Sequence, residues 1–233
     1  MSTGMPPQRL LLLIPPLTQL NTPYPSTAYL TGFLQSRNIA AEQADLGIEM
    51  VLRLFSRDGL TRVFADIRKL GDDLPPEAIA MLAMEQAYLD QIELVVSFLQ
   101  GKNPGAAARM LQAGVLPQGP RFRDRTKFAK SVPLQDRAKQ WATFYLEDLT
   151  DLVQATVSPQ FSLSRYAEQV ATSTSSFDGM IDALEAAPTI TDEFMLEALQ
   201  VHLDRVKPTL ICLSVPFPGN LYGAFRIAQA IKR

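Results

Sequence analysis

The sequence contains little cysteine and little histidine, with one residue of each among its 233 residues. A single cysteine excludes an intrachain disulfide, a cysteine-based zinc site and an iron–sulfur cluster ligated by this chain alone. A single histidine leaves little for metal binding or for triad chemistry, and no nucleophile–base pair is visible. Because an unpaired Cys212 is typical of a reducing compartment, we expect a cytoplasmic protein.

The chain also lacks a strong excess of charge and any long hydrophobic run. Its 22 Lys and Arg residues and 24 Asp and Glu residues leave a net charge of −2, which argues against a general nucleic-acid binder. The apolar run Leu10–Ile14 is shorter than the roughly 7–15 residues of a signal-peptide core and the ~20 of a membrane span. We therefore expect a soluble protein with no membrane partner and no nucleic-acid partner.

Strand signals occur only near the two ends of the sequence. Leu10–Ile14 and Thr209–Val215 are continuous apolar runs, which favour parallel strands buried on both faces, and Ile39–Leu46 reads as a third strand. The segment between Ile14 and Ile39 predicts a helix that Ser26 or Thr27 caps, so residues 10–46 form a β-α-β unit.

Residues 48–206 carry successive amphipathic helical patterns. The pattern predicts one helix from Pro76 to Gly101, another over Leu134–Val157, and a last one capped by Thr191. The expected fold is α/β but mostly helical by content, with an incomplete Rossmann-like (flavodoxin-like) parallel sheet of about three strands and a large all-α insertion. The expected domains are residues 1–47 with 207–233, and the inserted residues 48–206.

A parallel sheet with an open edge is a poor place for a domain to stop. Either the sequence is a fragment of a longer protein, or the helical layer closes the sheet; we favour the fragment. The final helix Leu221–Lys232 would then lead into a fourth strand.

Ligands of open parallel sheets bind outside the carboxyl ends of the strands. Three segments are expected to meet there: Pro15–Pro25, Asp45–Gly47 and Ser214–Tyr222. None contains a Gly-x-Gly-x-x-Gly or Walker A pattern, which excludes a standard dinucleotide site and a phosphate-cradling NTPase.

Two stretches, IPPLTQLNTPYPSTAYLTGFLQSRNIAAEQADLGIE from Ile14 and CLSVPFPGNLYGAFRIAQAIK from Cys212, carry a family resemblance. Together they resemble the N-terminal cobalamin (B12)-binding module of radical S-adenosylmethionine Fe-S oxidoreductases. The similar features are a first strand that runs into Pro-Pro, a Pro/Tyr loop that opens a helix, an Asp-Leu-Gly turn and a Pro-Phe-Pro-Gly-Asn loop. The resemblance covers residues 9–57 and 207–233.

The resemblance implies a cobalamin at the carboxyl edge of the sheet. Its implied contacts are Pro16, Thr18, Asn21, Thr22, Tyr24, Asp45, Gly47, Ser214, Pro216, Pro218, Gly219 and Asn220. The Asp-x-His-x-x-Gly of methyltransferase-type modules is missing from Pro15–Pro25, so cobalt would face water, an apolar side chain or nothing on its lower side. No catalytic and no metal-ligating residue is expected in this chain. The 4Fe-4S cluster and S-adenosylmethionine would belong to a downstream radical barrel domain in cis, with an unknown small-molecule substrate.

Two other interpretations remain open. One is a helical interaction or scaffold module whose α/β part is purely structural, and the other is a small stand-alone α/β enzyme. Asp45 either binds a ligand or caps the next helix, whereas Cys212 and His202 are expected to be structural. The basic residues from Arg121 to Lys130 are expected to form a solvated loop or a dock for another domain rather than an RNA contact.

Overall fold

The protein is described by a computed structural model that covers residues 8–17, 20, 24–71, 74–123, 132–163 and 177–232. The fold is α/β, mostly helical, with a small open sheet whose strands are all parallel. The chain forms two compact units. We call Met1–Val51 with Leu163–Arg233 the α/β unit, and Leu52–Ser162 the helical unit. No helix within the described residues is both long enough and apolar enough for a membrane crossing.

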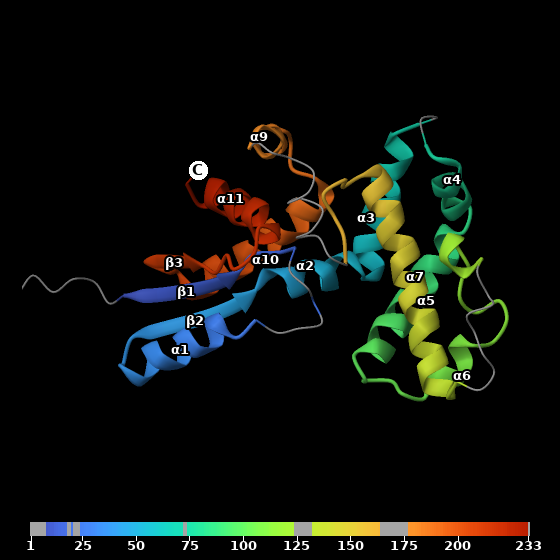
Figure 1. Cartoon of the computed structure of the whole chain (residues 1–233), viewed down its shortest axis with the longest axis horizontal. Coiled ribbons are helices and arrows are strands. Elements are labelled where there is room, and N and C mark those ends of the chain that lie inside the picture. The colour runs from blue at the N-terminus through green and yellow to red at the C-terminus, as the bar shows by residue number, and fades with distance from the viewer. Residues whose placement is uncertain are drawn as a thin grey trace, which may run out of the picture. The chain divides into compact units, whose positions relative to one another are not determined.

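The sheet has the order β2-β1-β3, with β1 in the centre (Figure 1). β1 (Arg9–Ile14) pairs in parallel with β2 (Ala40–Asp45) on one side and with β3 (Leu210–Leu213) on the other. Leu11 and Leu13 are fully buried, as expected for a central strand covered on both faces. The predicted parallel sheet of three strands is therefore confirmed.

The α/β unit contains the helices α1 (Ser26–Ser36), α9 (Asp178–Glu185), α10 (Ile190–Val206) and α11 (Gly219–Lys232), and the border with the helical unit falls within α2 (Leu46–Leu54). Figure 1 shows α1 on one side of the sheet and α10 and α11 on the other. On the α1 side, Leu10, Leu12 and Ala41 form a small apolar core with the half-buried Cys212 packed against it.

The orientation of α1 differs from a simple interpretation of its apolar residues. Tyr29 and Phe33 are apolar residues at helical spacing, but they are 78% and 56% exposed, whereas Thr27 and Thr31 are buried. The exposed Tyr29 is therefore not packed between α1 and the sheet. The predicted cap is also wrong, because the N-cap position is Pro25 and makes no side-chain hydrogen bond.

The helical unit is built from α3 (Arg57–Lys69), α4 (Pro76–Leu82), α5 (Glu85–Leu99), α6 (Ala106–Met110), the 3-10 turn Pro120–Phe122 and α7 (Leu134–Thr156). Its core includes Phe64, Tyr88 and Tyr145, and the Tyr145 hydroxyl donates to the backbone carbonyl of Tyr88. Burial raises the pKa of both tyrosines. The single helix predicted from Pro76 to Gly101 is two helices, which meet at Ala83 and Met84.

The borders of the compact units lie after Val51 and before Leu163. The sequence pattern placed the change in character after residues 47 and 206 instead. α9 and α10 therefore belong with the sheet by packing, because buried polar bonds join both helices to α11. α10 begins with a capping box, in which Thr189 and Asp192 exchange hydrogen bonds. The predicted cap Thr191 is wrong; it lies inside the first turn.

Candidate functional site

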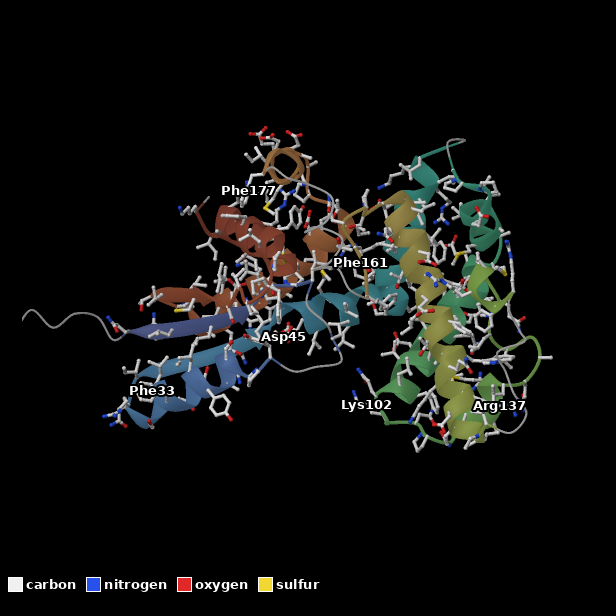
Figure 2. The ribbon with its side chains drawn as sticks, viewed as in Figure 1. Phe33, Asp45, Lys102, Arg137, Phe161 and Phe177 are labelled. Atoms are coloured by element: carbon white, nitrogen blue, oxygen red, sulfur yellow. The ribbon has the colours of Figure 1, made fainter. Side chains whose placement is uncertain are left out.

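The carboxyl ends of the three parallel strands share one edge of the sheet, and the loops that follow them form the candidate site. Three of the residues implied by the resemblance, Thr18, Asn21 and Thr22, lie outside the described residues. The others fall into three groups, which follow β1, β2 and β3 respectively. Figure 2 labels Asp45 at this end of the sheet and Phe33 at the opposite end, near the finish of α1.

The loop after β1 is held directly by the start of α11. The side-chain amide of Asn220 donates to the carbonyls of Pro15 and Pro16 at 2.8 and 3.4 Å, and Asn220 is fully buried. Proline carbonyls that leave a strand have no ladder partner, so this amide provides one. A Cβ on Gly223 would lie 2.9 Å from the Pro16 ring, which is why α11 has a glycine at this approach.

One polar atom at this junction has no partner among the described residues. The Oδ1 of Asn220 is buried and accepts no hydrogen bond from that part of the chain. A buried acceptor without a donor costs about 1–3 kcal/mol. The junction therefore offers one unsatisfied acceptor beside the end of β1.

Two serines meet across the site. Ser26, at the start of α1, lies with its hydroxyl 2.7 Å from the hydroxyl of Ser214, just after β3. Ser214 also donates its backbone N–H to Leu13 at 2.9 Å. A hydroxyl carries one proton, so one serine donates to the other and the second keeps a proton for another acceptor. The sequence indicated Ser214 but assigned Ser26 to capping, because nothing local links residues so far apart.

An aromatic pair lies beside the serines in the chain. The rings of Tyr24 and Phe217 pack edge to face with centroids 5.7 Å apart. Phe217 is 47% exposed and Val215 is 39% exposed, and Tyr24 is half-buried. We call Tyr24, Val215 and Phe217 the strand-end patch. Residues Ser214–Asn220 carry no charge, so this surface is apolar with neutral polar groups at its border.

The remaining predicted residues of the loop after β3 differ in their exposure to solvent. Pro216 is half-buried and Pro218 is exposed, whereas Gly219 is buried in the first turn of α11. Pro218 and Phe217 close that turn by accepting the N–H groups of Leu221 and Asn220. These two backbone N–H groups in the first turn of α11 therefore have acceptors within the protein. Phe217 was not among the site residues that the sequence predicted.

Asp45 caps the helix that follows β2. One oxygen of its carboxylate accepts the N–H of Ile48 at 3.0 Å. Burial raises the pKa of Asp45, the N–H groups of Ile48 and Gly47 oppose that rise, and the nearby Glu49 adds to it. The capping role considered for Asp45 is present in the structure. The resemblance suggested that Gly47 lies in a turn, but the residue is helical, because α2 already begins at Leu46.

The other chemically distinctive residues have structural surroundings. His202, on α10, lies 2.6 Å from Glu49 through Nε2, and the guanidinium of Arg205 reaches its Nδ1 at 3.1 Å. Because Arg205 can only donate, Nδ1 accepts, and Nε2 carries the proton that bonds Glu49. Among the described residues, no group of three or more His, Cys, Asp or Glu side chains could hold a metal ion.

Of the basic residues from Arg121 to Lys130, the structure describes Arg121 and Arg123. Arg121 forms two hydrogen bonds with Asp151, at 2.7 and 2.9 Å. Arg125, Lys127 and Lys130 lie outside the described residues.

The site thus combines an exposed apolar patch, a serine pair with a spare proton and a buried amide, all neutral. This combination can bind a flat, uncharged ligand with amide groups, and no nucleophile–base pair occurs among the residues of the site that the structure describes. No protein-family model matches the chain, and no curated protein and no solved structure shows significant similarity to it.

Proposed function

We propose that the α/β unit is a cobalamin-binding module, with the corrin lying on the strand-end patch. The observation that carries the proposal is this neutral apolar surface at the carboxyl ends of strands ordered β2-β1-β3. In open α/β sheets this is the edge at which ligands bind, and the motif resemblance of the same loops names the ligand.

The residues present fit a corrin. Tyr24 and Phe217 supply aromatic surface for the ring system, and the spare hydroxyl proton of the Ser26–Ser214 pair can bond a side-chain amide of the corrin. The unsatisfied Oδ1 of Asn220 is an acceptor for an amide N–H. When bound, cobalamin supplies a cobalt centre for methyl transfer or electron transfer, and no histidine of the loop Pro15–Pro25 would ligate it.

The chain contributes binding rather than complete catalysis in this proposal. Radical S-adenosylmethionine chemistry needs a 4Fe-4S cluster held by three cysteines, and the sequence contains one. We therefore place the cluster, S-adenosylmethionine and the substrate in a radical barrel domain that acts in cis with this module.

Absorbance titration of the chain with hydroxocobalamin and methylcobalamin tests the proposal. We expect saturable spectral change and co-elution of cobalamin with the protein on gel filtration. Phe217→Ala should weaken binding about tenfold, since burial of a phenylalanine is worth about 1.5–3 kcal/mol. The matched control is Phe33→Ala, an exposed phenylalanine at the opposite end of the sheet, which should leave binding unchanged. Cobalamin that elutes separately from the unaltered chain would rule the proposal out.

A second candidate, a helical scaffold with a structural α/β part, is favoured by one observation. The start of α11 already holds the loop after β1, because the Asn220 amide donates to the Pro15 carbonyl. The same titration separates the candidates, because a scaffold would show no cobalamin-dependent change in spectrum or in thermal stability.

A further inference from the structure

The loop after β1 leaves its strand through a strained residue. Leu17, which follows Pro15 and Pro16, is left-handed with φ of 75°. Leucine rarely adopts this conformation, because its Cβ then crowds the backbone, whereas glycine adopts it freely. A strained residue persists only where its surroundings impose the conformation, and such residues are typical of ligand sites. The conformation of Leu17 therefore needs a group that holds it.

The side chain of Asn220 holds the two residues that precede Leu17. Its amide nitrogen donates to the carbonyls of Pro15 and Pro16 at 2.8 and 3.4 Å. The ring of Pro16 also fits closely against Gly223, where a Cβ would lie 2.9 Å from it. Because each proline ring fixes its own φ, Leu17 is the first residue after β1 at which the chain can turn freely.

This junction carries two costs that packing alone does not explain. Asn220 is fully buried, and its Oδ1 accepts no hydrogen bond from the described part of the chain. A buried acceptor without a donor and a strained backbone at Leu17 both destabilise the fold. Proteins keep such costs mainly at functional sites, so the junction is shaped for a function rather than for stability.

Asn220 connects the two loops that form the strand-end patch. Its backbone N–H donates to the carbonyl of Phe217 at 3.1 Å, so the amide and the Phe217 ring belong to one turn. The loop that the amide holds leads along the chain from Leu17 to Tyr24. The rings of Tyr24 and Phe217 meet edge to face, with centroids 5.7 Å apart. One side chain therefore bonds both of the loops that carry these rings.

We propose that Asn220 is a positioning residue, which fixes the loop after β1 so that Tyr24 lies against Phe217 and the two rings form a surface ready for the corrin. The inference rests on the proposed cobalamin function. A surface that is ordered before binding avoids the cost of ordering it on binding. Loss of the Asn220 amide should therefore weaken binding although both aromatic rings are unchanged.

Asn220→Asp tests the proposal through the pH dependence of methylcobalamin binding. A carboxylate cannot donate to the Pro15 carbonyl, whereas the protonated acid has an O–H that can. Pro15–Leu17 and Ser214–Tyr222 contain no charged residue, so neither loop supplies a cation that would keep the acid ionised. Relative to the unaltered chain at the same pH, we expect binding about tenfold weaker at about pH 8 and within about threefold at about pH 5.

Asn103→Asp is the matched control, because Asn103 is an exposed asparagine of the helical unit. It should bind methylcobalamin like the unaltered chain at both pH values. Equal binding by Asn220→Asp and the unaltered chain at about pH 8 would overturn the proposal. So would a loss in Asn220→Asp that persists unchanged at about pH 5.

A measurement without ligand separates this inference from the cobalamin function. If Asn220 imposes the left-handed turn, Leu17→Gly should unfold at a higher urea concentration than Leu17→Ala, since glycine adopts that turn without strain. In the Asn220→Asp background at about pH 8 the loop relaxes, and the order should reverse because alanine loses less entropy on folding. The same order in both backgrounds would overturn the proposal. The reversal in a chain that binds no methylcobalamin would support the positioning of the loop by Asn220 and reject cobalamin as the ligand.

Discussion

The hydroxyl of Tyr222 donates a hydrogen bond to the carboxylate of Asp192 at 2.8 Å, which joins α11 to the first turn of α10. The same hydroxyl accepts from Arg226 at 3.0 Å. Arg226 also donates to the carbonyls of Ala183 and Leu184 at the end of α9, at 2.6 and 2.8 Å. Burial raises the pKa of Tyr222 to about 12, so the hydroxyl keeps its proton and remains a donor. One buried arginine thus links three helices.

Replacement of Arg226 by Leu should destabilise the α/β unit strongly. The side chains of Arg226 and Asp192 are both 5% exposed, and removal of one partner leaves a buried charge and unpaired carbonyls. We expect a loss of about 3–5 kcal/mol in unfolding free energy, measured by urea denaturation. Arg121→Leu is the control, because its pair with Asp151 is about half exposed and should be worth at most about 1 kcal/mol. Equal losses for both variants would contradict the role assigned to Arg226.

Asp148 should make the stability of the helical unit depend on pH. Burial raises the pKa of Asp148 to about 6, although the N–H groups of Arg121 and Gly119 oppose that rise. In the unfolded chain the Asp148 carboxyl has the ordinary pKa of 3.8. Between these values the folded state binds more protons, so the contribution of Asp148 to stability rises as the pH falls from about 6 to about 4.

The difference in unfolding free energy between the unaltered protein and Asp148→Asn isolates this contribution. We expect the difference to change across that pH window and to be flat above it. Stability curves that stay parallel for the unaltered protein and Asp148→Asn would show that Asp148 does not titrate as described.

Gly223→Ala should disturb the junction of β1 and α11. The new Cβ would approach the Pro16 ring to 2.9 Å, so the loop after β1 must shift. We expect a loss of about 1–3 kcal/mol in unfolding free energy and weaker cobalamin retention. Gly32→Ala in α1 meets no atom within 4 Å and should instead stabilise the protein by about 0.5–1 kcal/mol. Calorimetry of both variants checks the opposite signs.

The Ser26–Ser214 pair should show coupling in a double-mutant cycle. Each single replacement by Ala removes the same hydroxyl contact, so we expect the double variant to lose little more stability than either single one. A coupling energy of about 0.5–1.5 kcal/mol is expected from thermal unfolding. Additive losses would mean that the two hydroxyls act separately.

The sheet could be predicted because its central strand is a pure apolar run. Leu10–Ile14 has no alternation, and only burial on both faces accommodates such a segment. The following βα turn was also predictable, because Pro15 and Pro16 cannot continue the ladder. Asn38, the residue after the C-cap Arg37 of α1, is left-handed with φ of 59°, a conformation that asparagine adopts readily.

The contacts within the site could not be predicted in the same way. Ser26 and Ser214 are 188 residues apart in sequence, and a serine at a helix start is explained locally by capping. Helical spacing shows that Tyr29 and Phe33 share a face, but it does not show whether that face meets the sheet or solvent. Asp45 was ambiguous for a related reason, since capping and ligand binding use the same carboxylate.

The discontinuous α/β unit determines the order in which a nascent chain can fold. Arg9 and Thr209 form hydrogen bonds across 200 residues of sequence, whereas the helical unit is the continuous segment Leu52–Ser162. At a synthesis rate of about 5–20 residues per second, β1 and β2 leave the ribosome many seconds before β3 exists. During that interval the helical unit is complete, and its formation brings the two ends of the segment near each other and shortens the loop that β3 must close. Until then the side of β1 that β3 later covers stays unpaired, which leaves the central strand of the sheet with one partner, β2.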